Sequence, residues 1–367
     1  MTPAARVGGG VLAGILTSAA IALVAGATVH APATTDRLVP EDASGHLKRI
    51  AIHYVPSMDD RAMPVWNQLF ATLPADVEVE VAVPDQHDFD HFITRMQHPE
   101  RFHAVVVGHP LTTWSRDRMA SLTSPDGDSI LSPPRVPVAS GARAGDWDAP
   151  FAIARDVYHA KPIISELVFE GGDLAASSSH VFADANLIGR NLGRRDATRE
   201  HIENVLGHTF TQDVVFLGDA QGEVPEHHIM MYMVPLDDHR VLVGDVTMGQ
   251  KLKTAELEAD ADIELQRRRF DRVAELLTAR GFEVTRIPVV VLPGAGSYVT
   301  YTNALFDRDA SGPIVYLPTY DQPALDDAAS AAYTKLGYRV IPIDVSSIYT
   351  LNGSLGCLIN VMARTQP

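Results

Sequence analysis

Residues 281–289 read Gly-Phe-Glu-Val-Thr-Arg-Ile-Pro-Val, and residues 337–345 read Gly-Tyr-Arg-Val-Ile-Pro-Ile-Asp-Val. Both stretches have the form Gly, aromatic, x, Val, x, x, Ile, x, Val, and each follows a segment with a helical pattern. A glycine in this place ends a helix, and the alternating apolar residues after it are typical of a strand. Residues 73–83 form a looser third copy without the glycine. The recurrence predicts an α/β protein built from repeats around one core; the alternative is the helix-Gly-strand punctuation of any α/β protein.

The composition narrows the class of protein. The chain of 367 residues has 30 Lys and Arg against 46 Asp and Glu, which gives a formal net charge of −16. Hydrophobic residues make up 46% and charged residues 21%, a mixture typical of globular proteins. Because phosphate recognition depends on clustered Lys and Arg, the acidic balance argues against nucleic acid or an anionic membrane surface as a partner. It favours a cationic substrate.

The N-terminus differs from the rest of the chain. Arg6 is followed by an apolar run over residues 7–29, which ends in a small-x-small pattern. This combination predicts a secretory signal over residues 1–31, and therefore a secreted or periplasmic protein. The alternative is an uncleaved membrane anchor, because about 20 apolar residues can span a bilayer.

The remainder of the chain is expected to hold a linker and one domain. We assign residues 32–46 to a polar linker and residues 47–367 to a single α/β domain. Within that domain, residues 121–150 are rich in Pro, Gly, Ser and Asp, which predicts a long surface loop.

The chain has one cysteine, Cys357, which follows the Gly/Ser-containing turn at residues 352–356. A single cysteine forms neither an internal disulfide nor a cysteine-based zinc site. We expect a short helix after the turn, and a thiol at a helix N-terminus has a lowered pKa. One interpretation of Cys357 is a catalytic nucleophile, and the other is a buried structural cysteine.

Three acidic residues are candidates for a cation site. Glu170 and Asp173 flank a glycine pair, whose backbone freedom allows both carboxylates to point into one pocket. Asp117 ends the motif Trp-Ser-Arg-Asp at residues 114–117. Paired carboxylates suit a guanidinium group, which donates bidentate hydrogen bonds. The alternatives are an ordinary acidic turn and a helix cap.

Two adjacent histidines introduce a predicted β-hairpin. His227 and His228 precede the apolar residues 229–234, and residues 240–246 are expected to form the second strand. A histidine at a strand edge can act as a general acid or base near neutral pH; the alternative is a solvated or hydrogen-bonded side chain. A metal site would need these two residues and His239, whose spacing matches no strong ligand motif. We expect no metal and no cofactor.

Four motifs, taken in chain order, resemble those of the pentein superfamily of guanidino-group-modifying enzymes. They are Arg116-Asp117, residues 170–173, His228 at the hairpin and Cys357 after its turn. That superfamily includes arginine and agmatine deiminases, dimethylarginine hydrolases and amidinotransferases. The resemblance covers the chain from residue 48 to its end. It implies a catalytic domain with the fold of a five-bladed, pseudo-symmetric α/β propeller, and a site in the central channel.

The resemblance also implies a role for each catalytic candidate. Cys357 would attack the guanidinium carbon to give a tetrahedral adduct and then a covalent thiouronium. His228 would protonate the leaving amine and then activate water. Glu170 would hold His228 or the guanidinium nitrogens.

The resemblance also bears on residues that would bind the substrate or compete as the base. Asp117 and Asp173 would bind the substrate, with stabilisation of a turn as the alternative for Asp173. His208 is a competing base, and we prefer His228 because it opens the hairpin. The family's hairpin reads His-x-Asp, whereas this chain has Met230 at the position of the Asp. A negative charge for the guanidinium is therefore missing.

The predicted function is an exported hydrolase of the deiminase type, which cleaves a guanidino or amidine compound and releases ammonia or an amine. The substrate is a small molecule or a protein arginine. The alternatives are an amidinotransferase and, because of Met230, a catalytically impaired binding protein. The pattern does not select which arginine binds a substrate carboxylate. The candidates are Arg135, Arg143, Arg155, Arg190, Arg194 and Arg195.

Overall fold

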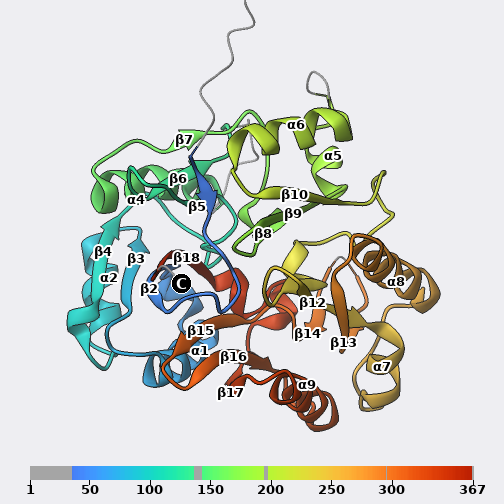
Figure 1. Cartoon of the computed structure of the whole chain (residues 1–367). Helices are drawn as coiled ribbons and strands as arrows, with labels where there is room; N and C mark the ends of the chain where they lie inside the picture. The colour runs from blue at the N-terminus through green and yellow to red at the C-terminus, as the bar shows by residue number, and fades with distance from the viewer. Residues whose placement is uncertain (1–34, 136–142, 194–196, 295, 366–367) are drawn as a thin grey trace, which may run out of the picture. The chain divides into compact units, whose positions relative to one another are not determined.

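The computed structural model describes residues 35–135, 143–193, 197–294 and 296–365 (Figure 1). The described residues belong to one compact unit, and the segment expected to be a signal or an anchor lies outside them. Among the described residues, no helix has both the length and the apolar character needed to cross a membrane.

Five small sheets hold the strands of the described residues. In each sheet, a middle strand pairs antiparallel with one neighbour. The same strand pairs parallel with a second neighbour, which follows it in the chain after at least one helix. Figure 1 shows the five sheets following one another around a common centre. The predicted five-bladed α/β propeller is confirmed.

The elements fall into five units of the same plan. The first contains β18 (Ile359–Arg364), β2 (Leu47–His53), β3 (Glu78–Val83) and β4 (Phe102–Val106), with η1 (Pro56–Met58), α1 (Asp59–Thr72), α2 (Gln86–Ile93) and η2 (Pro99–Arg101). The second contains β1 (Arg37–Leu38), β5 (Ala120–Thr123), β6 (Ser129–Ser132) and β7 (Ile163–Ile164), with α3 (Arg143–Asp146) and α4 (Ala149–Tyr158). The third contains β8 (Ala175–Ala176), β9 (His180–Asp184) and β10 (Asp213–Leu217), with η3 (Gly171–Asp173), α5 (Asn186–Arg190) and α6 (Arg199–Thr209).

The last two units complete the ring. The fourth contains β11 (Met233–Pro235), β12 (Arg240–Asp245), β13 (Glu283–Val291) and β14 (Tyr298–Thr300), with η4 (Ile229–Met231), α7 (Val246–Leu252) and α8 (Ile263–Ala279). The fifth contains β15 (Leu305–Asp309), β16 (Gly312–Thr319) and β17 (Arg339–Asp344), with α9 (Pro323–Lys335), η5 (Tyr349–Leu351) and η6 (Leu355–Leu358).

The C-terminal strand closes the ring. β18 does not stay with the fifth sheet but pairs antiparallel with β2 of the first, with Ile359 opposite Ile52. Figure 1 shows β18 beside β2. This closure places the turn that carries Cys357 directly before a strand of the first unit.

Both copies of the glycine motif end a helix as predicted. Gly281 after α8 and Gly337 after α9 have the same φ of +89°, which an L side chain rarely adopts. The following residues, Phe282 and Tyr338, donate backbone hydrogen bonds into the last turn of each helix at 3.1 and 3.0 Å. This is the hydrogen bonding of a Schellman C-cap, and each glycine therefore redirects the chain into β13 or β17.

Two sequence expectations differ from the structure. The described part of the expected linker, residues 35–46, packs on the domain: β1 pairs with β5, and Leu38 and Val39 are buried. The stretch 121–150, expected as a surface loop, contains most of the antiparallel pair β5 and β6, with Leu122 buried. These strands were missed because each is only four residues long.

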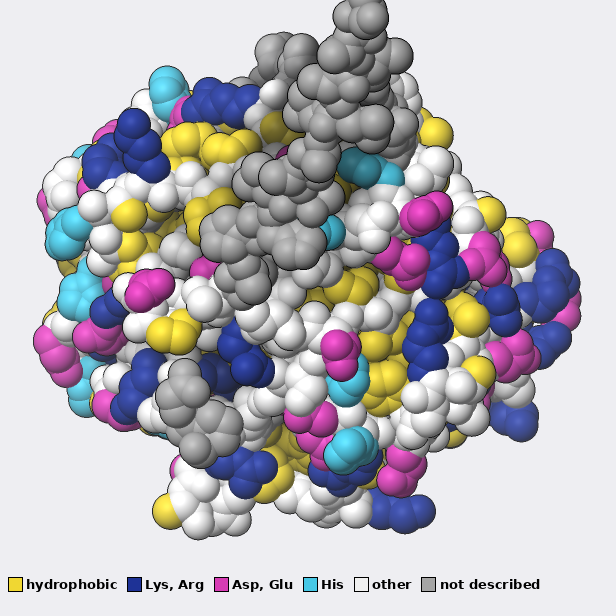
Figure 2. Space-filling view, turned by 45° about the horizontal axis from the view of Figure 1, so that its top comes forward, with side chains coloured by type: hydrophobic (Ala, Val, Ile, Leu, Met, Phe, Trp, Pro, Cys, Tyr) yellow, Lys and Arg dark blue, Asp and Glu magenta, His cyan; other side chains and the backbone are white. Residues whose placement is uncertain are grey.

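Charged side chains of both signs are intermingled on the face shown in Figure 2. On α8, for example, Arg267 forms ion pairs with Glu264 and Asp271 at 2.6 and 2.7 Å. The excess of acidic residues is thus partly balanced by local ion pairs. Exposed pairs of this kind contribute little to stability.

Candidate active site

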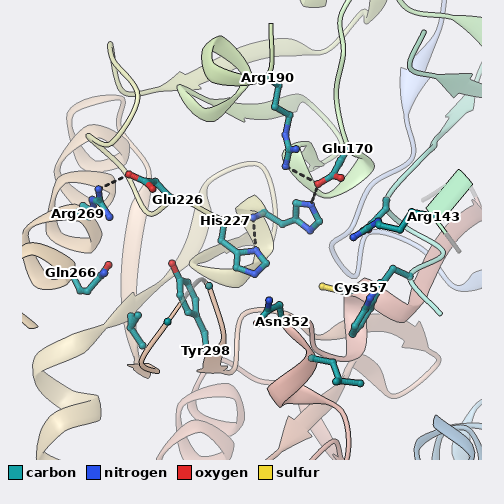
Figure 3. A pocket seen from close by; sticks show the side chains of 17 residues that line it. Arg143, Glu170, Arg190, Glu226, His227, Gln266, Arg269, Tyr298, Asn352 and Cys357 are labelled. Atoms are coloured by element: carbon teal, nitrogen blue, oxygen red, sulfur yellow. Dashed lines mark hydrogen bonds and ion pairs between the residues drawn. The ribbon is translucent and has the colours of Figure 1, made fainter. Parts of the chain in front are cut away.

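A cavity of about 420 Å³ opens at the centre of the five units. It brings together four of the residues predicted from the sequence: Asp117, Glu170, His228 and Cys357. Figure 3 shows Cys357 on one side of this cavity, with Glu170 and Arg190 across from it. The other residues that line it are Trp114, Arg143, Arg190, Glu226, His227, Gln266, Arg269, Val291, Gly294, Gly296, Tyr298, Leu351 and Asn352.

Cys357 lies in a tight turn whose geometry Asn303 fixes. The backbone N–H of Cys357 donates to Oδ1 of Asn303 at 3.2 Å, and Nδ2 of Asn303 donates to Sγ at 3.4 Å. The expected helix is only the 3₁₀ turn η6, after which the chain enters β18. Asn303 therefore holds the thiol from two sides.

His228 is held against Glu170. It precedes η4, and its Nε2–H donates to Oε2 of Glu170 at 2.9 Å. Glu170 also forms ion pairs with Arg118 at 2.8 Å and with Arg190 at 2.7 Å. Nδ1 of His228 has no other hydrogen-bond partner among the described residues and is left for the thiol of Cys357. The carboxylate thus fixes the imidazole by one nitrogen and leaves the second free for chemistry.

The charges of these groups are coupled. Burial disfavours the charged forms of all three, but their mutual contacts outweigh this effect. The thiol of Cys357 and the carboxylate of Glu170 raise the pKa of His228 to about 9. The imidazolium in turn lowers the pKa of the Cys357 thiol. Together with the two arginines, it also holds the pKa of Glu170 well below its usual range. Both shifts are toward the thiolate–imidazolium pair, which is the reactive form of a cysteine nucleophile.

The two glycines at residues 171 and 172 are needed because other segments of the chain pack closely against them. A Cβ on Gly172 would lie 2.4 Å from Nδ1 of His228, and one on Gly171 would lie 2.1 Å from the carbonyl oxygen of Met119. Neither glycine has a positive φ. The expectation of an unusual backbone turn is thus wrong; the pair is needed because two other segments press against it.

Asp117 faces the cavity and is already paired. Its backbone carbonyl accepts a hydrogen bond from Gly171 N–H at 3.1 Å, which ties its turn to Glu170. Its carboxylate forms an ion pair with Arg143 of α3, whose side chain is 45% exposed. The other two carboxylates that line the cavity also have arginine partners, because Arg190 contacts Glu170 and Arg269 contacts Glu226 at 2.6 Å.

Asp173 does not line the cavity. It is 1% exposed, its Oδ2 accepts the backbone N–H of Glu170 at 2.7 Å, and Arg190 contacts it at 2.6 Å. This is a reciprocal capping box across η3. The structure places Asp173 where it stabilises the turn under Glu170, which was the alternative to substrate binding for this residue.

Other sequence candidates lie away from the thiol. His208 is exposed on α6 and lines a different pocket. Met230 is 1% exposed and belongs to the hydrophobic core, and its carbonyl accepts a hydrogen bond from Thr302 at 2.8 Å. Among the described residues, no group of His, Cys, Asp and Glu is arranged to hold a metal ion.

Sequence reasoning missed several residues of this site. Arg118 was not singled out, and Arg190 was one of six equivalent candidates, because only the folded chain places them on Glu170. Asn303 was not singled out either, although the family resemblance covers its part of the chain. His227 was considered as one of two histidines at the hairpin and as a metal ligand, but no separate role was assigned to it. Its position next to His228 was the one signal available for it.

Comparisons with known proteins agree with this geometry. The profile of the Porphyromonas-type peptidyl-arginine deiminase family matches residues 52–362. No curated protein matches the chain at a significant level. Among solved structures, an agmatine deiminase of C. jejuni is similar with a TM-score of 0.65 and 15% identity, covering 90% of this chain and 97% of its own. An agmatine deiminase of Enterococcus faecalis has a TM-score of 0.66 and 12% identity, covering 90% and 96%.

The family profile spans the first unit through to the last strand, and so includes all four of the predicted residues that the cavity brings together. The two solved structures share the fold over nearly their whole length. The chain belongs to the Porphyromonas-type peptidyl-arginine deiminase family of the pentein superfamily, and is by that membership a hydrolase of the guanidino-modifying type.

Proposed function

We propose that this protein hydrolyses a guanidino compound through a covalent intermediate on Cys357 and releases ammonia or an amine. The observation that carries the proposal is the arrangement of three side chains in one cavity. Glu170 holds His228 at 2.9 Å, and His228 and Cys357 shift each other's pKa toward the charged pair. A nucleophile, its acid/base partner and the group that orients the partner are thus present together.

The reaction balances with these groups and water alone. The thiolate of Cys357 adds to the guanidinium carbon, and the tetrahedral adduct expels ammonia, which takes the proton from His228. A thiouronium remains on the sulfur. Neutral His228 then takes a proton from water, whose oxygen adds to the same carbon. Collapse of this second adduct breaks the C–S bond, and the hydroxyl proton passes to the solvent, where it protonates the released ammonia. The ureido product leaves, and the thiolate and the His228 imidazolium are restored.

Asp117 is the carboxylate best placed to bind the guanidinium. Position 230, where the family has Asp, holds a core methionine, so no carboxylate reaches the cavity from there. Glu170 is occupied by His228, Arg118 and Arg190. The three cavity carboxylates are balanced by three arginines, and the site therefore has little excess charge for a dication.

The direct test is ammonia release from a panel of compounds: arginine, agmatine, methylated arginines and an arginine-containing peptide, with methylamine release followed for the methylated members. We expect release without any added amine acceptor, with agmatine the poorest member because it carries a second positive charge. Norleucine, which lacks the guanidino group, is the control. A folded protein that releases nothing from any member would contradict hydrolysis and favour the transferase or the binding protein.

The ion pair between Asp117 and Arg143 leads to a second expectation. A substrate guanidinium must displace Arg143 from the carboxylate, and a half-exposed pair is worth about 0.2–1 kcal/mol. Arg143→Ala is therefore expected to lower KM for a guanidino substrate about two- to fivefold and to leave kcat unchanged. The measurement is the steady-state kinetics of Arg143→Ala and of a control variant, Arg155→Ala. Arg155 is a suitable control because it pairs with Asp156 outside the cavity. A higher KM in Arg143→Ala would instead show that Arg143 binds the substrate.

A further inference from the structure

His227 connects the two halves of the active site. Its Nδ1 accepts the backbone N–H of His228 at 2.7 Å. Its imidazole also lies against the backbone of Asn352, which begins the turn leading to Cys357. Figure 3 shows His227 beside Asn352, with the dashed line to its neighbour above the ring. One side chain therefore spans the segment of the acid/base and the segment of the nucleophile.

The first hydrogen bond fixes the protonation state of His227. A backbone N–H can only donate, so Nδ1 must be unprotonated, and the ring proton must be on Nε2. The exclusion of water and the positive charge of His228 lower the pKa of His227 to about 3, while the Asn352 contact opposes this shift. His227 thus stays neutral over the pH range in which His228 and Cys357 change charge.

The surroundings hold the ring in place. The rings of His227 and Tyr298 are 5.3 Å apart, and the rings of His227 and His228 are also 5.3 Å apart. A Cβ on Gly296 would lie 3.1 Å from Cδ2 of His227, which is tighter than most real contacts. On the other side, Ser297 donates a hydrogen bond to the side chain of Asn352. The contact partners of the ring are therefore themselves fixed.

We propose that His227 is a positioning residue for the hydrolysis: its neutral imidazole sets the separation of the His228 acid/base from the Cys357 thiol by joining their main chains. This inference rests on the function proposed above. It assigns His227 no contact with the reacting atoms. It explains why the ring lines the cavity and yet contacts the backbone of both segments.

The test compares two variants of His227. His227→Phe keeps a ring but loses the Nδ1 acceptor, whereas the Oδ1 of His227→Asn can still accept from His228 N–H. A displacement of about 1 Å between reacting groups can cost about 100-fold in rate. We expect His227→Phe to lower kcat about 10- to 100-fold, to change KM less than about twofold, and to raise the pH midpoint of Cys357 alkylation by iodoacetamide. His227→Asn should recover part of each loss. His208→Phe, at an exposed histidine on α6, is the matched control.

A second measurement needs neither turnover nor a variant. Nitrogen NMR of histidine-labelled wild-type protein should show His227 as the neutral tautomer with the proton on Nε2, unchanged from pH 5 to 9. An imidazolium or an Nδ1–H tautomer would overturn the proposal. A folded His227→Phe variant with the kcat and the alkylation midpoint of the wild type would also overturn the proposal. A variant in which only KM is raised would do the same. If the wild type turns over no substrate, the proposed function fails. The alkylation midpoint and the NMR spectra still test the positioning role of His227, because neither depends on turnover.

Discussion

Cys357→Ala is expected to abolish release of ammonia from every guanidino substrate, with a loss of at least about 10⁴-fold in kcat. The reason is that no other nucleophile replaces the sulfur: Cys357 is the only cysteine of the chain. The fold should remain, because the change removes one buried heavy atom at a cost of about 1 kcal/mol. The measurement is ammonia release, with circular dichroism and thermal unfolding on the same preparation.

No turnover through another group at position 357 is expected, since the methyl side chain of Ala has no nucleophilic atom. Residual activity at the wild-type rate in folded Cys357→Ala would contradict a cysteine nucleophile. It would leave the cavity as a site for direct attack by water. A variant that unfolds would be replaced by Cys357→Ser, which keeps nearly the same volume and should still lose most activity.

Glu170→Gln is expected to disable the catalytic pair by changing the charge of His228. The pKa of His228 is raised to about 9 in part by the carboxylate of Glu170, so its loss lowers that pKa. Less imidazolium at neutral pH stabilises less thiolate, and the pKa of Cys357 rises. We therefore expect the pH midpoint of Cys357 alkylation to move to higher pH, and kcat at pH 7 to fall by about 100-fold or more.

The same change is expected to destabilise the fold. In the wild type, Glu170 is charged in the folded state even at low pH because its pKa is depressed. Its stabilising effect is therefore present above the ordinary pKa of a carboxyl group and is lost as the pH falls below it. Gln removes the carboxylate that pairs with Arg118 and leaves Arg190 with Asp173, at a cost of about 1–3 kcal/mol in urea unfolding at neutral pH.

Glu223→Gln is the control for this prediction, because Glu223 pairs with Arg272 at 2.6 Å outside the cavity. An unchanged alkylation midpoint in Glu170→Gln would show that the carboxylate does not set the charge of His228. An unchanged free energy of unfolding would show that the two arginines find other partners.

The sequence indicated the repeat because it depends on a local pattern, whereas the five-bladed ring was implied by the family resemblance. Gly281 and Gly337 end their helices by backbone geometry alone, so two copies of one motif were enough to predict a repeated unit. Cys357, His228, Glu170 and Asp117 were found because their residue types and order resemble a known family. The short strands β5 and β6 have too few residues to show a period and were not predicted.

What could not be predicted depends on contacts across the chain. Arg143 meets Asp117 from 26 residues away, and Arg118 meets Glu170 from 52 residues away. Nothing in their neighbours distinguishes these arginines from exposed ones. The roles of Asp173 and of the glycine pair were also undetermined, since capping and close approach are visible only when His228 is in place. His227 was noticed for its residue type, but its hydrogen bond with His228 N–H was not predictable.

The measurement that tests the central claim most directly is the mass of the protein during turnover. Wild-type protein would be mixed with the best substrate of the panel, quenched in acid within milliseconds to seconds, digested and analysed by mass spectrometry. We predict a peptide containing Cys357 that is heavier by the substrate minus ammonia, or minus the amine for a methylated substrate. An unmodified Cys357 in protein that is releasing ammonia, or an adduct on another residue, would contradict the account.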